Sequence, residues 1–285
     1  MSGEPFKVGL VQMRSGVEPE RNIADALGLI AEAATAGARF VSTPEMTNVM
    51  DSRRAVLVQK VREEKDDPAV AAFAEAARTH GIHLLVGSLA LKHGDKLVNR
   101  SLLFTPEGAI AARYDKIHLF DVDLPNGDVY RESATYDPGA AAVTAELPWG
   151  TLGMTVCYDV RFPHLYRSLA QSGATFLSVP AAFTRITGEA HWHVLLRARA
   201  IESGAFVFAA AQGGRHENGR ETFGHSLVIS PWGEVIAEAG TDPCVIVADI
   251  DPALSAEARA RVPSLRHDRP YAAPGLEQEP RRRAS

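Results

Sequence analysis

One order of short segments occurs twice along this chain, and the repetition limits the possible folds more than any other feature. Four segments of the first half have counterparts in the second half, in the same order: Val8–Leu10 with Leu152–Met154, Ala36–Pro44 with Ser172–Pro180, His80–Ile82 with Ser203–Ala205, and Ser101–Gly108 with Ser226–Gly233. These matches indicate a duplicated unit, and chance similarity between α/β segments is the alternative.

The periodicity of apolar residues predicts the content of the unit as strand, helix, strand, helix, strand and hairpin. In the first half we expect strands at Lys7–Gln12, Arg39–Thr43 and His83–Leu91, helices at Pro19–Ala36 and Pro68–His80, and a hairpin from Asn99–Thr105 and Ala109–Tyr114. In the second half we expect strands at Gly150–Val156 and Thr175–Ala181 and helices from about Phe162 and at Glu189–Ser203.

Each unit would form a mixed sheet with helices on one face, and the two free faces could be buried against each other. The predicted fold class is therefore α/β, a four-layer αββα sandwich built from two similar units. Two separate domains are the alternative, but no Pro/Ser-rich linker occurs near 141–150. We expect one domain over residues 1–272 and a flexible tail over 273–285.

Composition excludes several classes of function. The chain of 285 residues is 46% hydrophobic with a formal charge of −5, typical of a soluble globular protein and unlike a nucleic-acid-binding one. No apolar run reaches the 18 or more residues of a membrane span, and MSGEPFK does not resemble a signal peptide. The two cysteines, Cys157 and Cys244, fit a reducing compartment. We expect a cytoplasmic protein without nucleic-acid or membrane partners.

Cys157 is unusual because it follows an apolar strand and precedes Tyr-Asp-Val-Arg and a predicted helix. A thiol at a helix N-terminus has a lowered pKa, which favours the nucleophilic thiolate. Cys244, in contrast, is expected in a core strand. Glu45 follows an apolar strand and a proline, and Lys116 follows the hairpin. Because the carboxyl ends of strands gather ligands in α/β sheets, these side chains are candidates for a common site.

The three motifs together resemble those of a known family. TPEMTN around Glu45, RYDKIHLFDVDLP around Lys116 and TVCYDVRFP around Cys157 are similar to the Glu, Lys and Cys motifs of the nitrilase superfamily, the carbon–nitrogen hydrolases. The resemblance extends from about Lys7 to Pro270 and implies an αββα sandwich. It also implies a second catalytic glutamate in the loop after the lysine, a place that Glu132 occupies here.

The resemblance further implies a chemistry without a metal or organic cofactor. Glu45 would take the proton of Cys157, the thiol would form a thioester, and Lys116 with the N–H of Tyr158 would hold the oxyanion, releasing ammonia and a carboxylic acid. Glu132 would orient Lys116 or the attacking water. On the substrate side we expect Tyr158, with Arg161 binding a carboxylate and Phe183 and Thr187 lining the pocket.

The segment from Ala181 to Glu202 resembles the amidase branch that includes ω-amidases and deaminated glutathione amidases. AQGGRH, FGHS and PWG further along favour the latter, so deaminated glutathione is the expected substrate. The alternatives are an ω-amidase acting on 2-oxoglutaramate, an N-carbamoyl hydrolase and a nitrilase. Members of the family commonly form homodimers or larger homo-oligomers, and the resemblance implies the same here.

Two other classes of function compete with this interpretation. His191 and His193 beside Glu189 superficially resemble a metal site, but residues two apart on a helix do not face one another. We therefore expect no metal. The other class is an interaction protein whose active site has decayed. The presence of all four expected polar residues, Glu45, Lys116, Glu132 and Cys157, argues against it.

Overall fold

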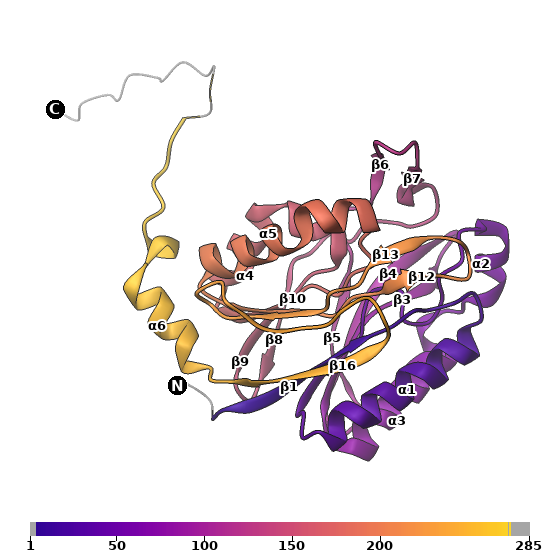
Figure 1. Ribbon diagram of the computed structural model, residues 1–285, viewed down its shortest axis with the longest axis horizontal. Helices are drawn as coiled ribbons and strands as arrows, with labels where there is room; N and C mark the ends of the chain where they lie inside the picture. The colour runs from indigo at the N-terminus through magenta and orange to yellow at the C-terminus, as the bar shows by residue number, and fades with distance from the viewer. Residues whose placement is uncertain (1–3, 273, 275–285) are drawn as a thin grey trace.

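Two six-stranded sheets lie face to face in the computed structural model, with a pair of helices on each outer side (Figure 1). The structure describes residues 4–272 and 274, so the tail expected over 273–285 falls almost entirely outside the described residues. The first sheet has the order β16 (Cys244–Ile250), β1 (Phe6–Gln12), β2 (Phe40–Ser42), β3 (His83–His93), β4 (Lys96–Phe104) and β5 (Ile110–Asp115). The second has the order β15 (Val235–Glu238), β14 (Leu227–Ile229), β11 (Phe206–Ala209), β10 (Ala174–Ser178), β9 (Gly150–Met154) and β8 (Val143–Leu147).

The helices complete the four layers. α1 (Pro19–Thr35) and α3 (Pro68–His80) cover the first sheet, and α4 (Pro163–Gln171) and α5 (Arg185–Ser203) cover the second (Figure 1). One apolar core fills the space between the sheets, and a second fills the space between the first sheet and its helices. This arrangement confirms the predicted αββα sandwich. No helix among the described residues is long and apolar enough to cross a membrane.

The same glycine position in each unit shows why the two halves share their sequence pattern. Gly9 pairs with Val41 across parallel strands, and Gly153 pairs with Leu177 in the same way. A Cβ on Gly9 would lie 2.9 Å from the Cβ of Ala33 on the covering helix. A Cβ on Gly153 would likewise lie within about 3.1 Å of the α4 side chain Leu169. Close packing of helix on strand therefore requires glycine at both equivalent positions.

Local capping explains which helix ends the sequence predicts well. α3 begins where Asp67 accepts a hydrogen bond from the N–H of Ala69, at 2.9 Å, and ends at Gly81 with a positive φ. α5 begins at Arg185 rather than at Glu189 as expected, because Thr184 caps it and accepts from the N–H of Thr187. The earlier start places Thr187 in the first turn of α5, nine residues after β10 ends at Ser178.

The sandwich also contains elements that the repetition does not include. α2 (Arg54–Lys60) follows the Glu45 segment, and α6 (Ala253–Arg261) follows β16. The stretch 116–141, which follows β5, contains a small hairpin of β6 (Asp121–Asp123) and β7 (Val129–Arg131). A second small hairpin, β12 (Gly213–Arg215) and β13 (Glu221–Phe223), interrupts the second unit. Figure 1 shows both hairpins on the same side of the sandwich.

The last strand returns to the first sheet. β16 pairs antiparallel with β1 over its whole length, from Phe6 opposite Ile250 to Gln12 opposite Cys244. β8 pairs with β9 in the equivalent manner in the second sheet. The core position expected for Cys244 is wrong, because β16 is an edge strand and Cys244 is half-buried at its start.

Candidate active site

A cavity of about 390 Å³ lies between the loops that follow β2, β5 and β9. Glu45, Lys116, Glu132 and Cys157 all line it, together with Tyr158, Phe183 and Thr187. The parallel strands β2, β9 and β10 end on the same side of the sandwich, so their carboxyl ends deliver these loops to one place. Seven of the eight residues predicted for the site therefore share one cavity.

Glu45 is a buried residue of the cavity wall that is held by several hydrogen bonds. Its carboxylate accepts hydrogen bonds from three donors: Lys116 Nζ and Asn99 Nδ2 on Oε1, and the N–H of Ala182 on Oε2, each at 2.9 Å. The neighbouring Met46 has a φ of +56°, and Gln212 Nε2 donates to the carbonyl of Glu45 at 3.0 Å. The side chain is 4% exposed, so its position depends on these partners and not on water.

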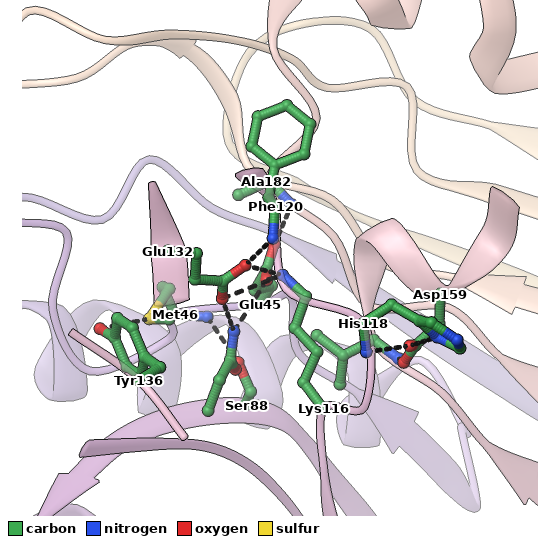
Figure 2. A network of polar contacts seen from close by, with 12 residues as sticks. Glu45, Met46, Ser88, Lys116, His118, Phe120, Glu132, Tyr136, Asp159 and Ala182 are labelled. Atoms are coloured by element: carbon green, nitrogen blue, oxygen red, sulfur yellow. Dashed lines mark hydrogen bonds and ion pairs between the residues drawn. The ribbon is translucent and has the colours of Figure 1, made fainter. Parts of the chain in front are cut away.

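Lys116 lies between two carboxylates (Figure 2). Its Nζ is 2.9 Å from Glu45 Oε1 and 2.8 Å from Glu132 Oε2. Burial favours the neutral amine, but the charges of Glu132 and Glu45 raise the pKa of Lys116 well above its ordinary value. The group is therefore an ammonium at neutral pH, aimed at the cavity.

Glu132 is fixed from its other side. Its Oε2 accepts from the N–H of Phe120 at 2.6 Å (Figure 2). Its Oε1 accepts from Asn99 Nδ2 at 3.2 Å. Asn99 thus bridges both glutamates. Sequence reasoning missed this residue, although a lone amide within the apolar strand LVNRSLLF is a signal for a buried polar partner.

Cys157 begins a short 3-10 helix, Cys157–Arg161, and has a φ of +50°. A left-handed conformation costs a residue other than glycine about 1–3 kcal/mol, and such strain concentrates at functional sites. The hydrogen bond from its N–H to the carbonyl of Pro180, at 2.9 Å, helps to hold this conformation. No sequence pattern predicts it, because the residue is not a glycine.

The expected lowering of the Cys157 pKa is wrong for the free protein. Burial raises the pKa of the Cys157 thiol well above its ordinary value, and the negative charge of Glu45 raises it further. The Lys116 charge lowers this pKa but does not overcome the other two effects. For Glu45, burial favours the acid, yet Lys116 and a hydrogen bond from Cys157 hold its pKa below the ordinary value. The resting pair is therefore a neutral thiol beside a carboxylate.

Asp159 connects the cysteine turn to the lysine segment. This fully buried carboxylate accepts from the hydroxyl of Tyr114 at 2.7 Å and from the N–H of His118 at 3.0 Å, two residues on either side of Lys116. It also accepts from the N–H of Val156, next to Cys157, at 2.9 Å. Figure 2 shows the His118 side chain directed at Asp159. One carboxylate thus sets the spacing between the two segments.

The predicted substrate-side residues divide into two groups. Tyr158, Phe183 and Thr187 lie in the cavity wall. Arg161 does not line the cavity, and its guanidinium contacts His191 Nδ1 at 3.3 Å. It lies over the rings of Phe183 and Tyr158, at 5.4 and 5.8 Å.

A second arginine, Arg220, lines the cavity and was not predicted. It comes from the β12–β13 hairpin and lies between the stretches AQGGRH and FGHS, which were used only for their family resemblance. Its guanidinium lies 5.3 Å from the ring centre of Tyr130, and its Nη2 donates to the carbonyl of Ala182 at 2.5 Å.

His216 fixes this hairpin to the first unit. Its Nδ1 is 2.9 Å from the carbonyl of Ser15, so Nδ1 carries the proton, and Nε2 then accepts from the hydroxyl of Thr222 at 2.7 Å. The side chain is 3% exposed. Burial lowers the pKa of His216 from 6.5 to about 4, which keeps the imidazole neutral in the folded protein.

Stability should consequently fall in mild acid. The unfolded chain binds a proton at His216 below pH 6.5, while the folded protein binds it only near pH 4. The contribution of His216 to the free energy of unfolding is therefore complete above pH 6.5 and is lost as the pH falls from 6.5 to 4. The expected loss is about 3 kcal/mol over the whole range and about 2 kcal/mol between pH 7.5 and pH 5. Urea unfolding at pH 7.5 and pH 5 measures it, and His216→Gln should flatten that pH dependence. An unchanged slope in this variant would contradict the assignment.

The histidines considered as a metal pair have separate partners. His191 contacts Arg161, whereas His193 Nε2 is 2.9 Å from Glu238 Oε1. Among residues 4–272 and 274, no cluster of three or more His, Cys, Asp or Glu side chains could hold a metal ion.

Comparisons with known proteins agree on one family. The sequence model described as "Carbon-nitrogen hydrolase" matches residues 7–260. Deaminated glutathione amidase of Yersinia enterocolitica is 40% identical over 266 residues, covering 92% of this chain and 92% of that protein. Omega-amidase NIT2 of Homo sapiens is 36% identical, covering 93% and 95%. The crystal structure of the C. elegans NitFhit protein superposes with a TM-score of 0.88 at 34% identity, covering 94% of this chain and 66% of that one.

Proposed function

Because this chain belongs to the carbon–nitrogen hydrolase family, the nitrilase superfamily, and is an amidase, we propose that Cys157 is its nucleophile and Glu45, Lys116 and Glu132 its catalytic partners. The observation that carries the proposal is the buried cluster itself, in which Lys116 is held between two glutamates beside the thiol. Such a cluster is costly to bury without a role, because each charge loses its hydration.

We assign each group a step that its contacts support. Glu45, a carboxylate in the resting protein, takes the proton of the Cys157 thiol as sulfur bonds to the amide carbon. The carbonyl oxygen becomes an oxyanion, for which the Lys116 ammonium supplies a donor. The backbone N–H of Tyr158 supplies a second donor, because the first N–H groups of a helix have no acceptor within the helix. Glu45 then gives its proton to the leaving nitrogen, and the amine departs from the thioester.

Water completes the cycle. Glu45 takes a proton from the water that attacks the thioester carbon, and the carboxylic acid leaves as the proton returns to the Cys157 sulfur. Glu132 contacts Lys116 through both of its oxygens, so we assign it to orienting the lysine rather than the water. The enzyme returns to its starting protonation with no cofactor consumed.

For the substrate, we propose deaminated glutathione, with 2-oxoglutaramate as the second candidate, on the similarity to the two named relatives. Both substrates present the same 2-oxoglutaryl group to the thiol and differ in the nitrogen that leaves. 2-Oxoglutaramate releases ammonia, whereas deaminated glutathione releases the amine of cysteinylglycine, so the ammonia product expected from the sequence applies to 2-oxoglutaramate alone. Release of 2-oxoglutarate therefore measures both reactions on one scale.

A panel experiment tests this order of preference. Wild-type protein is given deaminated glutathione, 2-oxoglutaramate, an N-carbamoyl amino acid and a simple nitrile, and kcat/KM is compared. We expect the highest value for deaminated glutathione. Preference for 2-oxoglutaramate would keep the mechanism and change the substrate, and turnover of only the nitrile would overturn the assignment.

We also propose a homodimer or larger homo-oligomer. Large apolar side chains are exposed on the outer face of α5 and on the adjoining turn after β14: Val194 69%, Ile201 56% and Trp232 55%. The turn adjoins the helix, because Arg197 Nε donates to the carbonyl of Gly233 at 2.8 Å. Exposed apolar patches of this kind mark interaction sites, and a second copy of the chain is the partner that we assign.

Replacing Ile201 with glutamate should weaken this assembly without touching the cavity. Light scattering after size exclusion should give a multiple of 30.7 kDa for the wild type and a smaller mass for the variant. Val58→Glu, an exposed apolar residue on α2, is the matched control. A wild-type protein with the mass of one chain would refute the proposal.

We further propose a cytoplasmic location. Cys157 and Cys244, the two cysteines of the chain, are both free thiols, which supports a reducing compartment. Fractionation of cells that express the protein tests this location.

A further inference from the structure

Arg220 lines the cavity with a guanidinium group whose hydrogen-bond donors are mostly without partners in residues 4–272 and 274. Its buried Nε has no hydrogen-bond partner among the described residues. One bond, from Nη2 to the carbonyl of Ala182, accounts for only one of the five donors of the guanidinium. A buried donor without an acceptor costs about 1–3 kcal/mol, and more where the group is charged. The buried Nε–H of Arg220 would therefore be stabilised by an acceptor on a bound ligand.

The charges around the cavity make Arg220 distinctive. Lys116 is held by Glu45 and Glu132, and Arg131 is paired with Asp123 at 2.7 Å. Arg54 is exposed at the rim. In the part of the chain that the structure describes, Arg220 forms no ion pair, although it is half-buried. It is the cation of the cavity wall best placed to gain from an incoming anion.

The position of Arg220 relative to the reacting groups is set by one residue. The N–H of Ala182 donates to Glu45 Oε2, and the carbonyl of Ala182 accepts from Arg220 Nη2. The arginine is therefore one residue's length beyond the catalytic glutamate, and its charge contributes to the low pKa of Glu45. Cys157 and Arg220 both line the cavity, so we take one end of a bound substrate to face the thiol and the other end the arginine.

The ring of Tyr130 restricts the geometry of binding. The guanidinium carbon of Arg220 lies over this ring, 5.3 Å from its centre, and its Nε–H has no partner within the described residues, so that group is left for a planar acceptor. A carboxylate matches the edge of a guanidinium through two parallel hydrogen bonds. Arg161, the arginine expected for this role, instead contacts His191 and lies outside the cavity lining.

We propose that Arg220 binds the carboxylate of the acyl part of the substrate and thereby selects amides that carry an acid group at the far end. The inference rests on the proposed function, because it takes the amide to be attacked by Cys157. It replaces Arg161 with Arg220 as the specificity-determining residue and makes the β12–β13 hairpin part of the acyl pocket.

The test compares glutaramate with pentanamide, in which a methyl group replaces the carboxylate. The ratio of kcat/KM for these two amides should fall about 10–100-fold in Arg220→Met, the value of one charge-assisted contact. Arg220→Lys keeps the charge without the fork and should give an intermediate ratio. Arg215→Met, on the same hairpin but outside the cavity lining, should keep the wild-type ratio.

A binding measurement separates this inference from the proposed function. Calorimetry with glutarate, the product, is carried out on Cys157→Ala and on the same variant with Arg220→Met, and the second should bind at least ten times more weakly. If the wild type hydrolyses no amide, the proposed function fails and the glutarate affinity still decides the role of Arg220. Equal affinities, or loss of discrimination in Arg161→Met but not in Arg220→Met, would overturn the inference.

Discussion

Cys157→Ala should lower kcat on the order of 10⁴-fold or more, the largest effect expected of any single substitution in this protein, because loss of a nucleophile removes the covalent route altogether. The fold should persist. Alanine fills the same buried site, 6% exposed, and loses one sulfur atom, while the φ of +50° is no worse for alanine than for cysteine. The measurement is 2-oxoglutarate release, with the melting temperature recorded beside it.

The second thiol of the chain provides the matched control. Cys244→Ala removes a half-buried sulfur at the start of β16 that does not line the cavity, so its rate should stay within twofold of wild type. Intact-mass spectrometry of wild-type protein quenched during turnover should also show the added acyl group, absent from Cys157→Ala. Equal rates in the two alanine variants would exclude a thioester at Cys157.

Glu45→Gln should have the second-largest effect, a fall in kcat of about 10²–10⁴-fold. Glutamine has almost the same shape but cannot take the thiol proton. Its NH2 group must face either the Lys116 and Asn99 donors or the N–H of Ala182, so at least one donor loses its acceptor. Stability should fall as well, by roughly 1–3 kcal/mol. Steady-state rates and urea unfolding measure the two effects.

The activity of the wild type should depend on pH through the ionisation of Glu45. Glu45 must be ionised to accept the proton, and Lys116 holds its pKa below the ordinary 4.5, so wild-type activity should fall only as the pH drops below 4.5. Alkylation of Cys157 by iodoacetamide provides a readout without turnover and should be slower in Glu45→Gln, whereas Glu45→Asp should retain part of the rate. Unchanged alkylation in the glutamine variant would remove Glu45 from the role of base.

The sequence predicted the parts of the fold that local chemistry determines. Gly9 and Gly153 mark equivalent close contacts, and Asp67 and Gly81 mark the ends of α3, so the repeat and the helix could be read directly. The start of α5 was placed late because Thr184 caps it within a segment that resembles a loop. Helix propensity alone does not reveal this cap, in which the Thr184 side chain accepts from the N–H of Thr187.

The site was predictable as a set of motifs and not as an electrostatic arrangement. Glu45, Lys116, Glu132 and Cys157 could be placed by their family motifs, but the pKa of Cys157 depends on burial and on the charges that tertiary packing brings together. Asn99 and Arg220 were missed for the same reason. Each acts through contacts with residues more than thirty positions away, which no local pattern encodes.

The pairing of β16 with β1 has a consequence for the synthesis of this enzyme. A chain emerging from the ribosome folds its N-terminal part first, yet the first sheet lacks its edge strand until residue 250 has emerged. The glutamates and the lysine belong to segments made early, and the cysteine and the arginine to segments made late. We therefore expect a chain that ends before β16 to have an incomplete first sheet, and the complete set of site residues to come together only after the late segments have folded onto the early ones.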